Sequence, residues 1–402
     1  MNKEMKQSEK VSAPLPFREG LGESPFDELI VRRGTNCVKW DEAPADDIIP
    51  LWVADMDFQV APAIQRAVQQ RAAHGIFGYT VVPEAYYEAV QSWFLRRHQW
   101  RIERADILYT TGVVPAVSCV LKALTLPGEK VLTLTPAYNC FFSSIRNSGC
   151  EVLESGLIME KGAFSLNWPD FEQKCADEKT TVFLLCNPHN PTGRVWRREE
   201  LTRMADTCRR HGVSIVSDEI HCELIMPGQR FVSMGTVCPD AIVLNSPSKA
   251  FNIAGLQIAN IICNNPQVRR RIDRAININE VCDVNPFGPV ALMAAYNESE
   301  DWLDDLNQYI WDNYQTLCEF AAKHLPGWKI AQLEGTYLPW VDISALGVTA
   351  QNYANHLLRK ARVWVNPGTM YDPNGPGDHI RLNIACPRSR LQEALRRIAE
   401  AS

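Results

Sequence analysis

The chain has no long apolar run and no excess of basic residues. No stretch approaches the roughly 20 apolar residues that span a bilayer. The polar start MNKEMKQSEKVSAPLPFREG has no apolar core of a secretory signal, so we expect a cytoplasmic protein with no membrane partner. The formal net charge of −6 argues against a surface that binds nucleic acid.

Paired cysteine spacings are also absent. The 13 cysteines include no C-x-x-C, which excludes a zinc ribbon and a thioredoxin-type redox pair. We expect reduced thiols, as in a cytosol, and no metal in the functional site. The chain also has neither G-x-G-x-x-G nor G-K-[ST], so neither dinucleotide binding nor a P-loop is supported.

What the sequence does contain is an alternation of apolar and amphipathic segments. A chain of 402 residues can bury a large core and form two domains. From about residue 105 to 265, short apolar runs alternate with helical patterns such as Glu199–His211. This predicts an α/β fold with a mainly parallel, seven-stranded sheet covered by helices. The predicted strands are Ile107–Tyr109, Lys130–Thr133, Val152–Glu154, Thr181–Leu185, Ser214–Ser217, Ala241–Leu244 and Ile258–Cys263.

The pattern changes after about residue 290 and predicts a smaller α+β domain. Its expected elements are a long helix, three strands and a final helix: Asp301–His324, Tyr337–Ile343, Val363–Val365, Ile380–Ile384 and a helix from Pro387. We predict four parts: a flexible arm (1–24), an N-terminal segment that packs with the small domain (25–50), a large domain (51–290) and the small domain (291–402).

Polar and turn residues gather where the predicted strands end. Ligands of open α/β sheets bind beyond the carboxyl ends of the strands. Five such ends therefore predict one site: TTGVVPAV (110–117), TPAYNCFF (135–142), CNPHNPTG (186–193), SDEIH (217–221) and SPSKAFN (246–252).

Two of these segments carry ionisable groups with chemical potential. Lys249 can form an imine with an aldehyde if burial or nearby cations lower its pKa. Ser246 and Ser248 beside it can donate hydrogen bonds to a phosphate. Asp218 follows the apolar run VSIV, and a carboxylate buried there needs a cationic partner such as a protonated pyridine nitrogen. The alternatives are an exposed lysine after a strand and a carboxylate that caps the next helix.

The other three segments offer neutral groups. Asn190 can donate its amide to a phenolic oxygen, although CNPHNPTG also reads as a rigid turn. Tyr138 can stack on a heterocycle, or simply belong to the core or the rim. The turn at Gly112 leads into a helix whose free N–H groups suit a phosphate.

Together these segments resemble the fold type I enzymes that use pyridoxal 5′-phosphate (PLP), the aspartate-aminotransferase-like superfamily. The combination is NPxNPTG, then D-E-I, then S-x-S-K, in that order. The chain is most similar to the cystathionine β-lyase (C–S lyase) branch of the class I/II aminotransferases, from residue 25 to the C-terminus. The segments that carry this closer match are PFDELIVRRGTNCVKWD (25–41), PLWVADMDF (50–58), HGIFGYT (74–80), LLCNPHNPTGRVW (184–196), SDEIH (217–221), SKAFNIAGL (248–256), GTYLPWVDI (335–343) and RLNIACPRS (381–389).

The resemblance implies a role for each residue. Lys249 would hold PLP as a Schiff base and carry the proton, and Asp218 would pair with the pyridine nitrogen. Asn190 would bind the phenolic oxygen, and Tyr138 would stack on the ring. The phosphate would lie on the backbone of Gly112, Val113 and Val114 and on Ser246 and Ser248. The amino-acid substrate would meet Arg381 at its α-carboxylate and a wall formed by Trp52, Val53, Ala54, Tyr337 and Asn383.

The resemblance also implies a homodimer and shows two departures. Tyr79 would reach the cofactor and substrate of the neighbouring subunit. His221 stands where the general family has a tyrosine that donates to the phenolic oxygen, a change that the C–S lyase branch shares. Gln257 stands where the family often has a phosphate-binding arginine, so phosphate binding would depend more on backbone amides, hydroxyls and Tyr79.

The implied activity is β-elimination. A C–S β-lyase would split cystathionine or a related S-substituted cysteine, which carries a leaving group on Cβ, into a thiol, pyruvate and ammonia. Two alternatives stay open: an aminotransferase that uses the same Lys249, Asp218 and Asn190, and a catalytically idle protein for regulation or partner binding.

Overall fold

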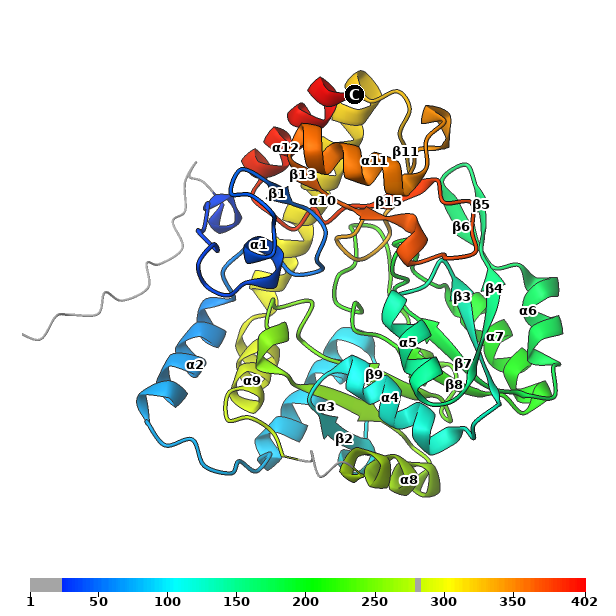
Figure 1. Cartoon of the computed structure of the whole chain (residues 1–402). Coiled ribbons are helices and arrows are strands. Elements are labelled where there is room, and N and C mark those ends of the chain that lie inside the picture. Colours follow the sequence, from blue (N-terminus) through cyan, green and yellow to red (C-terminus); the bar gives the residue numbers. More distant parts are fainter. Residues whose placement is uncertain (1–23, 279–282) are drawn as a thin grey trace, which may run out of the picture.

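The computed structural model describes residues 24–278 and 283–402 (Figure 1). The arm predicted for residues 1–24 lies outside this part of the chain, apart from Ser24. No helix in the described residues is long and apolar enough to cross a membrane. Two regions share the molecule: a large sheet with its helices, and the C-terminal elements, which lie at the top of Figure 1.

The large sheet has seven strands in the order β2-β10-β9-β8-β7-β3-β4. They are β2 (Ile107–Thr110), β3 (Lys130–Thr135), β4 (Glu151–Gly156), β7 (Thr180–Cys186), β8 (Ser214–Asp218), β9 (Ile242–Asn245) and β10 (Ala259–Ile262). All seven match predicted strands, and the mainly parallel sheet is confirmed. Only β10 runs antiparallel to its neighbours, so the other six strands end at the same edge.

Helices cover both faces of this sheet, because successive side chains of a strand point to opposite faces. In β7, Val182 and Leu184 pack into the apolar cluster of the first face, and Phe183 and Leu185 into that of the second. The first face is covered by α4 (Val113–Leu124), α5 (Asn139–Asn147) and α8 (Pro266–Asn277), and the second by α6 (Trp168–Cys175) and α7 (Arg198–His211). A strand buried on both sides reads as a continuous apolar run, which is why the sequence located these strands.

Four further helices form a layer beside the sheet, and aromatic side chains of this helical layer pack against one another. The helices are α2 (Pro62–Ala73), α3 (Glu84–His98), α9 (Gly288–Glu298) and α10 (Glu300–His324). Trp93 of α3 lies against Tyr296 of α9, with ring centroids 4.8 Å apart, and both rings contact Phe251. This cluster packs the helical layer against the segment that contains Lys249.

The C-terminal region is built around a four-stranded antiparallel sheet in the order β11-β12-β15-β14. Its elements are β11 (Lys329–Ile330), β12 (Trp340–Asp342), α11 (Ala350–His356), β14 (Asn366–Pro367), β15 (His379–Arg381) and α12 (Arg388–Ala401). The predicted strand at Val363–Val365 forms as β13 (Val363–Trp364). It pairs with β1 (Ile49–Pro50) of the N-terminal segment and not with this sheet. The domain boundaries themselves stay a prediction.

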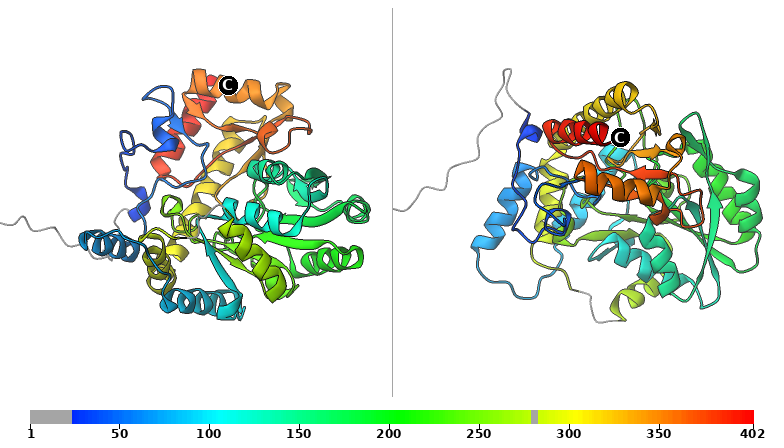
Figure 2. Two further views of the ribbon diagram at one scale, coloured as in Figure 1. Left: turned by 60° about the horizontal axis from the view of Figure 1, so that its bottom comes forward. Right: turned by 45° about the horizontal axis from the view of Figure 1, so that its top comes forward.

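The N-terminal segment lies beside α12 and β13, as the views in Figures 1 and 2 agree. Besides β1 this segment contains the short helix α1 (Val38–Asp41). Elsewhere, β5 (Ile158–Glu160) and β6 (Ala163–Ser165) form a separate hairpin that follows β4 of the large sheet. The segment is fixed by an ion cluster around Asp57, whose side chain is fully buried. Arg32, Lys39 and Arg390 contact the Asp57 carboxylate at 2.7, 3.3 and 3.1 Å. Buried charges persist only when they are paired, so this cluster fixes the segment that leads to Ala54.

Candidate active site

The polar strand ends meet in one cavity of about 190 Å³ at the carboxyl edge of the sheet. Residues from several loops line this cavity: the turn after β2, the loops after β7, β8 and β9, and the loop after β1 that contains Ala54. The lining residues are Ala54, Thr111, Gly112, Val113, Val114, Pro115, Tyr138, Cys186, Asn190, Asp218, Ile220, His221, Ser248, Lys249, Ala254, Gln257 and Ile258. Most of the residues proposed from the sequence are therefore brought together by the fold.

Lys249 follows β9 and reaches the main chain of the loop that follows β1. Its Nζ donates a hydrogen bond of 2.8 Å to the carbonyl oxygen of Ala54. Burial lowers the pKa of the Lys249 ammonium below its ordinary value; the charge of Asp55 opposes this shift, and that of Arg381 adds to it. A lysine with a lowered pKa is more readily a free amine, the form that attacks a carbonyl.

Asp218 ends β8 and is 4% exposed. One carboxylate oxygen accepts a hydrogen bond of 3.1 Å from the main-chain N–H of Ile220. Burial raises the pKa of Asp218 to about 7, although the charge of Lys249 works in the opposite direction. Within the described residues Asp218 forms no ion pair, so this buried acid can accept a cationic or N–H partner that enters the cavity.

His221 lines the same wall and is a neutral imidazole. Burial lowers its pKa to about 3, and the charges of Lys249 and Arg381 act in the same direction. Its Nδ1 is buried and makes no hydrogen bond to any described residue. The imidazole thus keeps one ring nitrogen available for a ligand in the cavity.

Asn190 and Arg381 are linked side chains from different parts of the chain. Arg381 of β15 is 3% exposed; its two terminal nitrogens donate to Asn190 Oδ1 at 3.0 Å and to the carbonyl of Trp52 at 2.9 Å. The guanidinium also lies over the ring of Tyr371, 4.6 Å from its centroid. Because its carbonyl oxygen accepts from Arg381, the Asn190 amide is oriented with its N–H₂ group as the donor for a ligand. Arg381 is not among the residues that line the cavity but lies directly behind Asn190.

The N-terminus of α4 forms one end of the cavity. Gly112 is its N-cap, and no side chain of the described residues caps the helix. The first N–H groups of a helix have no intrahelical acceptor, so those of Val113 and Val114 are open to an anion. Ser248 and Gln257 also line the cavity, and Gln257 brings no positive charge.

Two of the residues proposed to bind the cofactor, Ser246 and Tyr79, lie outside the cavity lining. The Ser246 hydroxyl donates to the carbonyl of Ile258 at 2.6 Å and accepts from the N–H of Ser248 at 3.0 Å, so its contacts in this structure are internal. Tyr79 is 99% exposed in the loop between α2 and α3. Within one chain, the cavity therefore forms without either side chain.

Tyr138 lines the cavity and is the N-cap of α5. Its ring packs edge-on against Phe141, with ring centroids 5.9 Å apart. Burial raises the pKa of the Tyr138 phenol, which therefore stays neutral. A flat heterocycle in the cavity would find this ring next to it.

The loop around Ala54 is held by residues whose importance the sequence only partly indicated. Tyr337 donates to the Ala54 carbonyl at 3.0 Å, and Asn383 donates to the carbonyls of Val53 and Asp55. Asn252 bonds to the main chain of Met56 through both its amide oxygen and its amide nitrogen. Asn252 and Tyr371 were not proposed; the only signal was that Asn252 belongs to the SKAFN motif, and Tyr371 belongs to no motif.

The cavity fits the cofactor that the sequence resemblance implied. PLP carries an aldehyde, a basic ring nitrogen, a phenolic oxygen and a phosphate. The described residues offer an amine at Lys249, a buried acid at Asp218, an imidazole nitrogen at His221 without a partner, and open amides at α4. Each group of the cofactor has a chemically matched partner.

Comparison with known proteins gives a consistent family. The family model for aminotransferase class I and II matches residues 46–398. The chain is 38% identical over 384 residues to cystathionine β-lyase PatB of Bacillus subtilis (strain 168), which covers 94% of this chain and 99% of that protein. Two solved structures are similar over 94% of this chain. Cystalysin from Treponema denticola, which contains PLP, is 33% identical with a TM-score of 0.90 over 98% of its chain. A PLP-bound protein of Clostridium difficile 630, described as an aminotransferase, is 36% identical with a TM-score of 0.91 over 100% of its chain.

Proposed function

This chain belongs to the aminotransferase class I and II family, and we propose that it is a PLP-dependent carbon–sulfur β-lyase. Its substrates are cystathionine or related S-substituted cysteines, and its products are a thiol, pyruvate and ammonia. One observation carries the proposal: Lys249, Asp218 and His221 share a single cavity in a chain that matches a named cystathionine β-lyase over nearly its full length.

Bound PLP supplies an electrophilic carbon for the substrate amine and a conjugated ring that accepts electron density from Cα. Lys249 would hold the cofactor covalently through its amine. Asp218 would keep the ring nitrogen protonated, and Asn190 and His221 would bind the phenolic oxygen. The N–H groups of α4 would bind the phosphate.

The freed Lys249 amine removes the proton from Cα. An amine with a lowered pKa is a suitable general base near neutral pH. The Ala54 carbonyl, 2.8 Å from Nζ, accepts one N–H and orients the nitrogen, and the Tyr337 hydroxyl fixes that carbonyl. Lys249 therefore acts from a defined position and not from a freely rotating side chain.

Arg381 binds the α-carboxylate of the substrate. A guanidinium matches a carboxylate in a two-bond geometry, and Asn190 and the Trp52 carbonyl already hold Arg381 in place. Fixing the carboxylate turns the Cα–H bond towards Lys249, which is a positioning effect.

Elimination follows proton removal when Cβ carries sulfur. Free thiols have a pKa of about 8.5, so a thiolate leaves without a strong acid beside it. The described cavity places no carboxylic acid other than Asp218 on its wall, which suits a leaving group of this kind.

The second candidate is an aminotransferase on the same scaffold. It is favoured by the similarity to the C. difficile protein described as an aminotransferase, and it uses the same Lys249, Asp218 and Asn190. A catalytically idle protein is disfavoured because Lys249 and Asp218 line one cavity and Arg381 binds Asn190 behind its wall.

The active unit that we propose is a cytoplasmic homodimer. The loop between α2 and α3 exposes apolar side chains, namely Ile76, Phe77, Tyr79 and Val81 at 67, 56, 99 and 83%. Exposed apolar groups of this density favour a partner surface. In the dimer, Tyr79 reaches the cofactor phosphate and the substrate of the neighbouring subunit and compensates for the uncharged Gln257.

The test is to incubate the PLP-loaded enzyme with cystathionine in the absence of any keto acid. A β-lyase releases pyruvate and a free thiol continuously, in equal amounts, and the Lys249→Ala variant releases neither. Conversion that stops after one turnover and resumes when a keto acid is added would instead establish an aminotransferase.

A further inference from the structure

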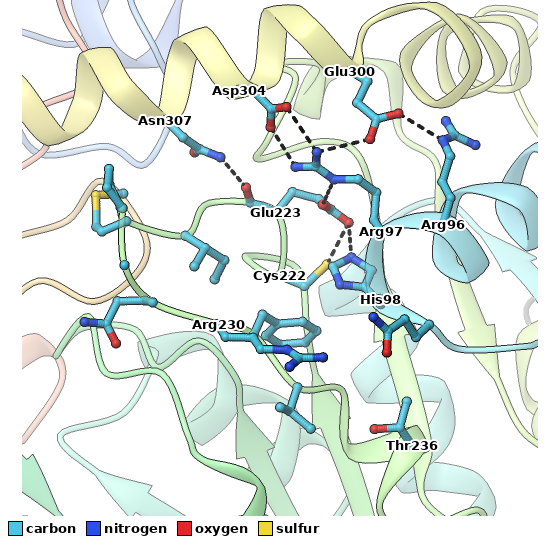
Figure 3. A pocket seen from close by; sticks show the side chains of 18 of the residues that line it. Arg96, Arg97, His98, Cys222, Glu223, Arg230, Thr236, Glu300, Asp304 and Asn307 are labelled. Atoms are coloured by element: carbon cyan, nitrogen blue, oxygen red, sulfur yellow. Dashed lines mark hydrogen bonds and ion pairs between the residues drawn. The ribbon is translucent and has the colours of Figure 1, made fainter.

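A second and larger cavity, of about 700 Å³, lies outside the catalytic site (Figure 3). Its walls are the end of α3, the segment after β8 and the first turns of α10. It shares no lining residue with the catalytic cavity among the residues described, although consecutive residues face the two: His221 faces the catalytic cavity and Cys222 the larger one.

Three potential metal ligands converge on one wall of this larger cavity. The Nε2 of His98, the Sγ of Cys222 and a carboxylate oxygen of Glu223 lie within 4.8 Å of one another. His98 Nε2 is 2.6 Å from Glu223 Oε1, and Cys222 Sγ is 3.5 Å from the same oxygen. Imidazole, thiolate and carboxylate are the donor set of zinc and chemically similar divalent ions.

The carboxylate of Glu223 is buried with an oxygen left over. The residue is 4% exposed, and its Oε2 accepts no hydrogen bond from the described residues. His98 Nε2 lies 2.6 Å from Oε1 and forms an ion pair with it when protonated. On the side of Oε2 the cation is Arg97, whose Nε lies 3.9 Å away and whose other nitrogens bind Glu300 and Asp304. Burying a carboxylate is costly unless its charge is compensated, and an ion bound here would add to the compensation that His98 and the shared Arg97 give.

A second buried acid lies near His98. Glu219 is 0% exposed and its Oε2 also lacks a hydrogen-bond partner in the described chain. Burial raises the pKa of Glu219 to about 7, and the charge of His98 opposes this shift. Glu219 is not among the residues that line the larger cavity, so it adds a second buried carboxyl group to the surroundings of His98 but no ligand.

The surrounding residues orient the ligands and leave a path for an ion. The indole N–H of Trp93 donates to Glu223 Oε1 at 2.6 Å, and Asn307 donates to the main-chain carbonyl of Glu223 at 2.8 Å. Hydrogen bonds from such neighbours hold metal ligands in position. The large cavity gives access to the ion and room for a water molecule as a further ligand.

We propose that His98, Cys222 and Glu223 bind one divalent transition-metal ion of the zinc type, with water from the larger cavity completing the coordination. The hydrogen bonds that His98 and Cys222 make to Glu223 Oε1 are exchanged for bonds to the ion. The Nε2 proton of His98 moves to Nδ1 or leaves to solvent, and Cys222 releases its thiol proton to solvent. Binding therefore weakens as the pH falls. The ion joins α3 to the segment that carries Asp218 and His221, so it stabilises the fold without entering the catalytic cavity.

The experiment titrates Co²⁺ into metal-free holoenzyme and counts bound ions after dialysis. We expect one ion per chain, with the visible bands of cobalt bound to a thiolate in tetrahedral geometry. Cys222→Ser and His98→Gln should each lower the affinity at least about tenfold, because each removes one of three ligands. The matched control is Cys119→Ser, a partly buried cysteine that lies outside this cavity and whose variant should bind as the parent does.

A measurement that needs no variant covers the case in which these proteins fail to fold. X-ray absorption on the zinc-loaded parent should show a sulfur ligand at about 2.3 Å. The proposal is overturned by a parent protein that retains no metal after dialysis. It is equally overturned by a zinc environment of nitrogen and oxygen alone, or by binding that survives both Cys222→Ser and His98→Gln.

Discussion

At the scale of single residues, burial sets the protonation of the two ionisable groups after β8, Asp218 and His221. Asp218 and His221 come from the same strand end, yet burial moves their pKa values in opposite directions, to about 7 and about 3. In each case it favours the uncharged form. When a ligand brings a protonated nitrogen to Asp218, the carboxyl group of Asp218 therefore changes from the neutral acid to the charged carboxylate.

The variant Asp218→Asn separates the effect of this acid on the stability of the fold from its effect on activity. In the cofactor-free protein, the folded pKa of about 7 lies above the ordinary value of 3.8. The folded state thus binds the proton more tightly, and stability is lost as the pH rises from about 4 to about 7. The rise of the Asp218 pKa from 3.8 to about 7 corresponds to a loss of about 4 kcal/mol in the free energy of unfolding at high pH. An asparagine at this position is neutral at every pH, so the variant avoids that loss.

Urea unfolding of the cofactor-free parent and variant at pH 4 and pH 8 measures this effect. We expect the variant to be the more stable at pH 8 and the two to be alike at pH 4. Glu219 titrates in the same range but is common to both proteins, so their difference isolates Asp218. Identical midpoints at pH 8 would contradict the account. With cofactor bound, the variant should lose about 10²-fold or more in kcat/KM, because the ring nitrogen loses its acidic partner.

The sequence indicated where a side chain lies when a motif fixes both the residue and its place at a strand end; the roles of these residues stay a prediction. Lys249, Asp218 and Asn190 are of this kind, and all three line the cavity. The hydroxyl of Ser246 bonds to Ile258, a main-chain contact across the fold that no local pattern reveals. The support of Arg381 by Tyr371 is likewise a tertiary contact without a sequence signature.

At the scale of elements, the apolar runs predicted where the strands are but not how they are connected in space. β10 reads like its neighbours because it too is buried on both faces, and its antiparallel direction follows only from the fold. β13 pairs with β1, which lies far away in the chain. The sequence did not predict this pairing, because a strand of two residues is too short to carry a pairing signal. Pairing partners are set by packing and not by local composition.

The ion cluster of the N-terminal segment also depends on tertiary structure. Lys39 is 0% exposed and lies 3.3 Å from Asp57, although an isolated lysine in a sequence is expected on the surface. Lys39→Met should destabilise the protein by about 3 kcal/mol. This is the lower end of the range for breaking a buried pair, because Arg32 and Arg390 still face Asp57.

Chemical denaturation of the holoenzyme measures this loss against a matched control. Lys329 is 69% exposed in its side chain and lies 3.8 Å from Asp342, so Lys329→Met should change stability by less than about 0.5 kcal/mol. Equal effects of the two substitutions would show that the buried cluster does not hold the segment. Since this segment carries Ala54, Lys39→Met should also lower kcat.

At the scale of the whole molecule, the sequence predicted the sheet, its helical layers and the site at its edge. It did not predict the cavity beside His98 and Glu223, whose residues come from distant parts of the chain and share no spacing motif. The residues themselves also gave no prediction of a dimer, which came only from the family resemblance. A single chain forms the cavity around Lys249 without Tyr79.

Mixing two inactive variants tests the proposed dimer. Tyr79→Ala removes a residue donated to the neighbouring site, and Lys249→Ala inactivates its own site. A hybrid dimer then contains one site with both side chains intact. Unfolding and refolding an equal mixture should restore about a quarter of the parental activity, as random pairing in a two-fold dimer requires. No recovery in hybrid dimers of verified composition would place Tyr79 in its own subunit's site.

The most direct test of the account is the covalent bond between the cofactor and Lys249. Borohydride reduction of the PLP-loaded protein, followed by proteolysis and mass spectrometry, identifies the labelled lysine. The account predicts one phosphopyridoxyl group per chain, on Lys249, and none on the Lys249→Ala variant. A label on another lysine, or an unlabelled chain that still releases pyruvate from cystathionine, would contradict it.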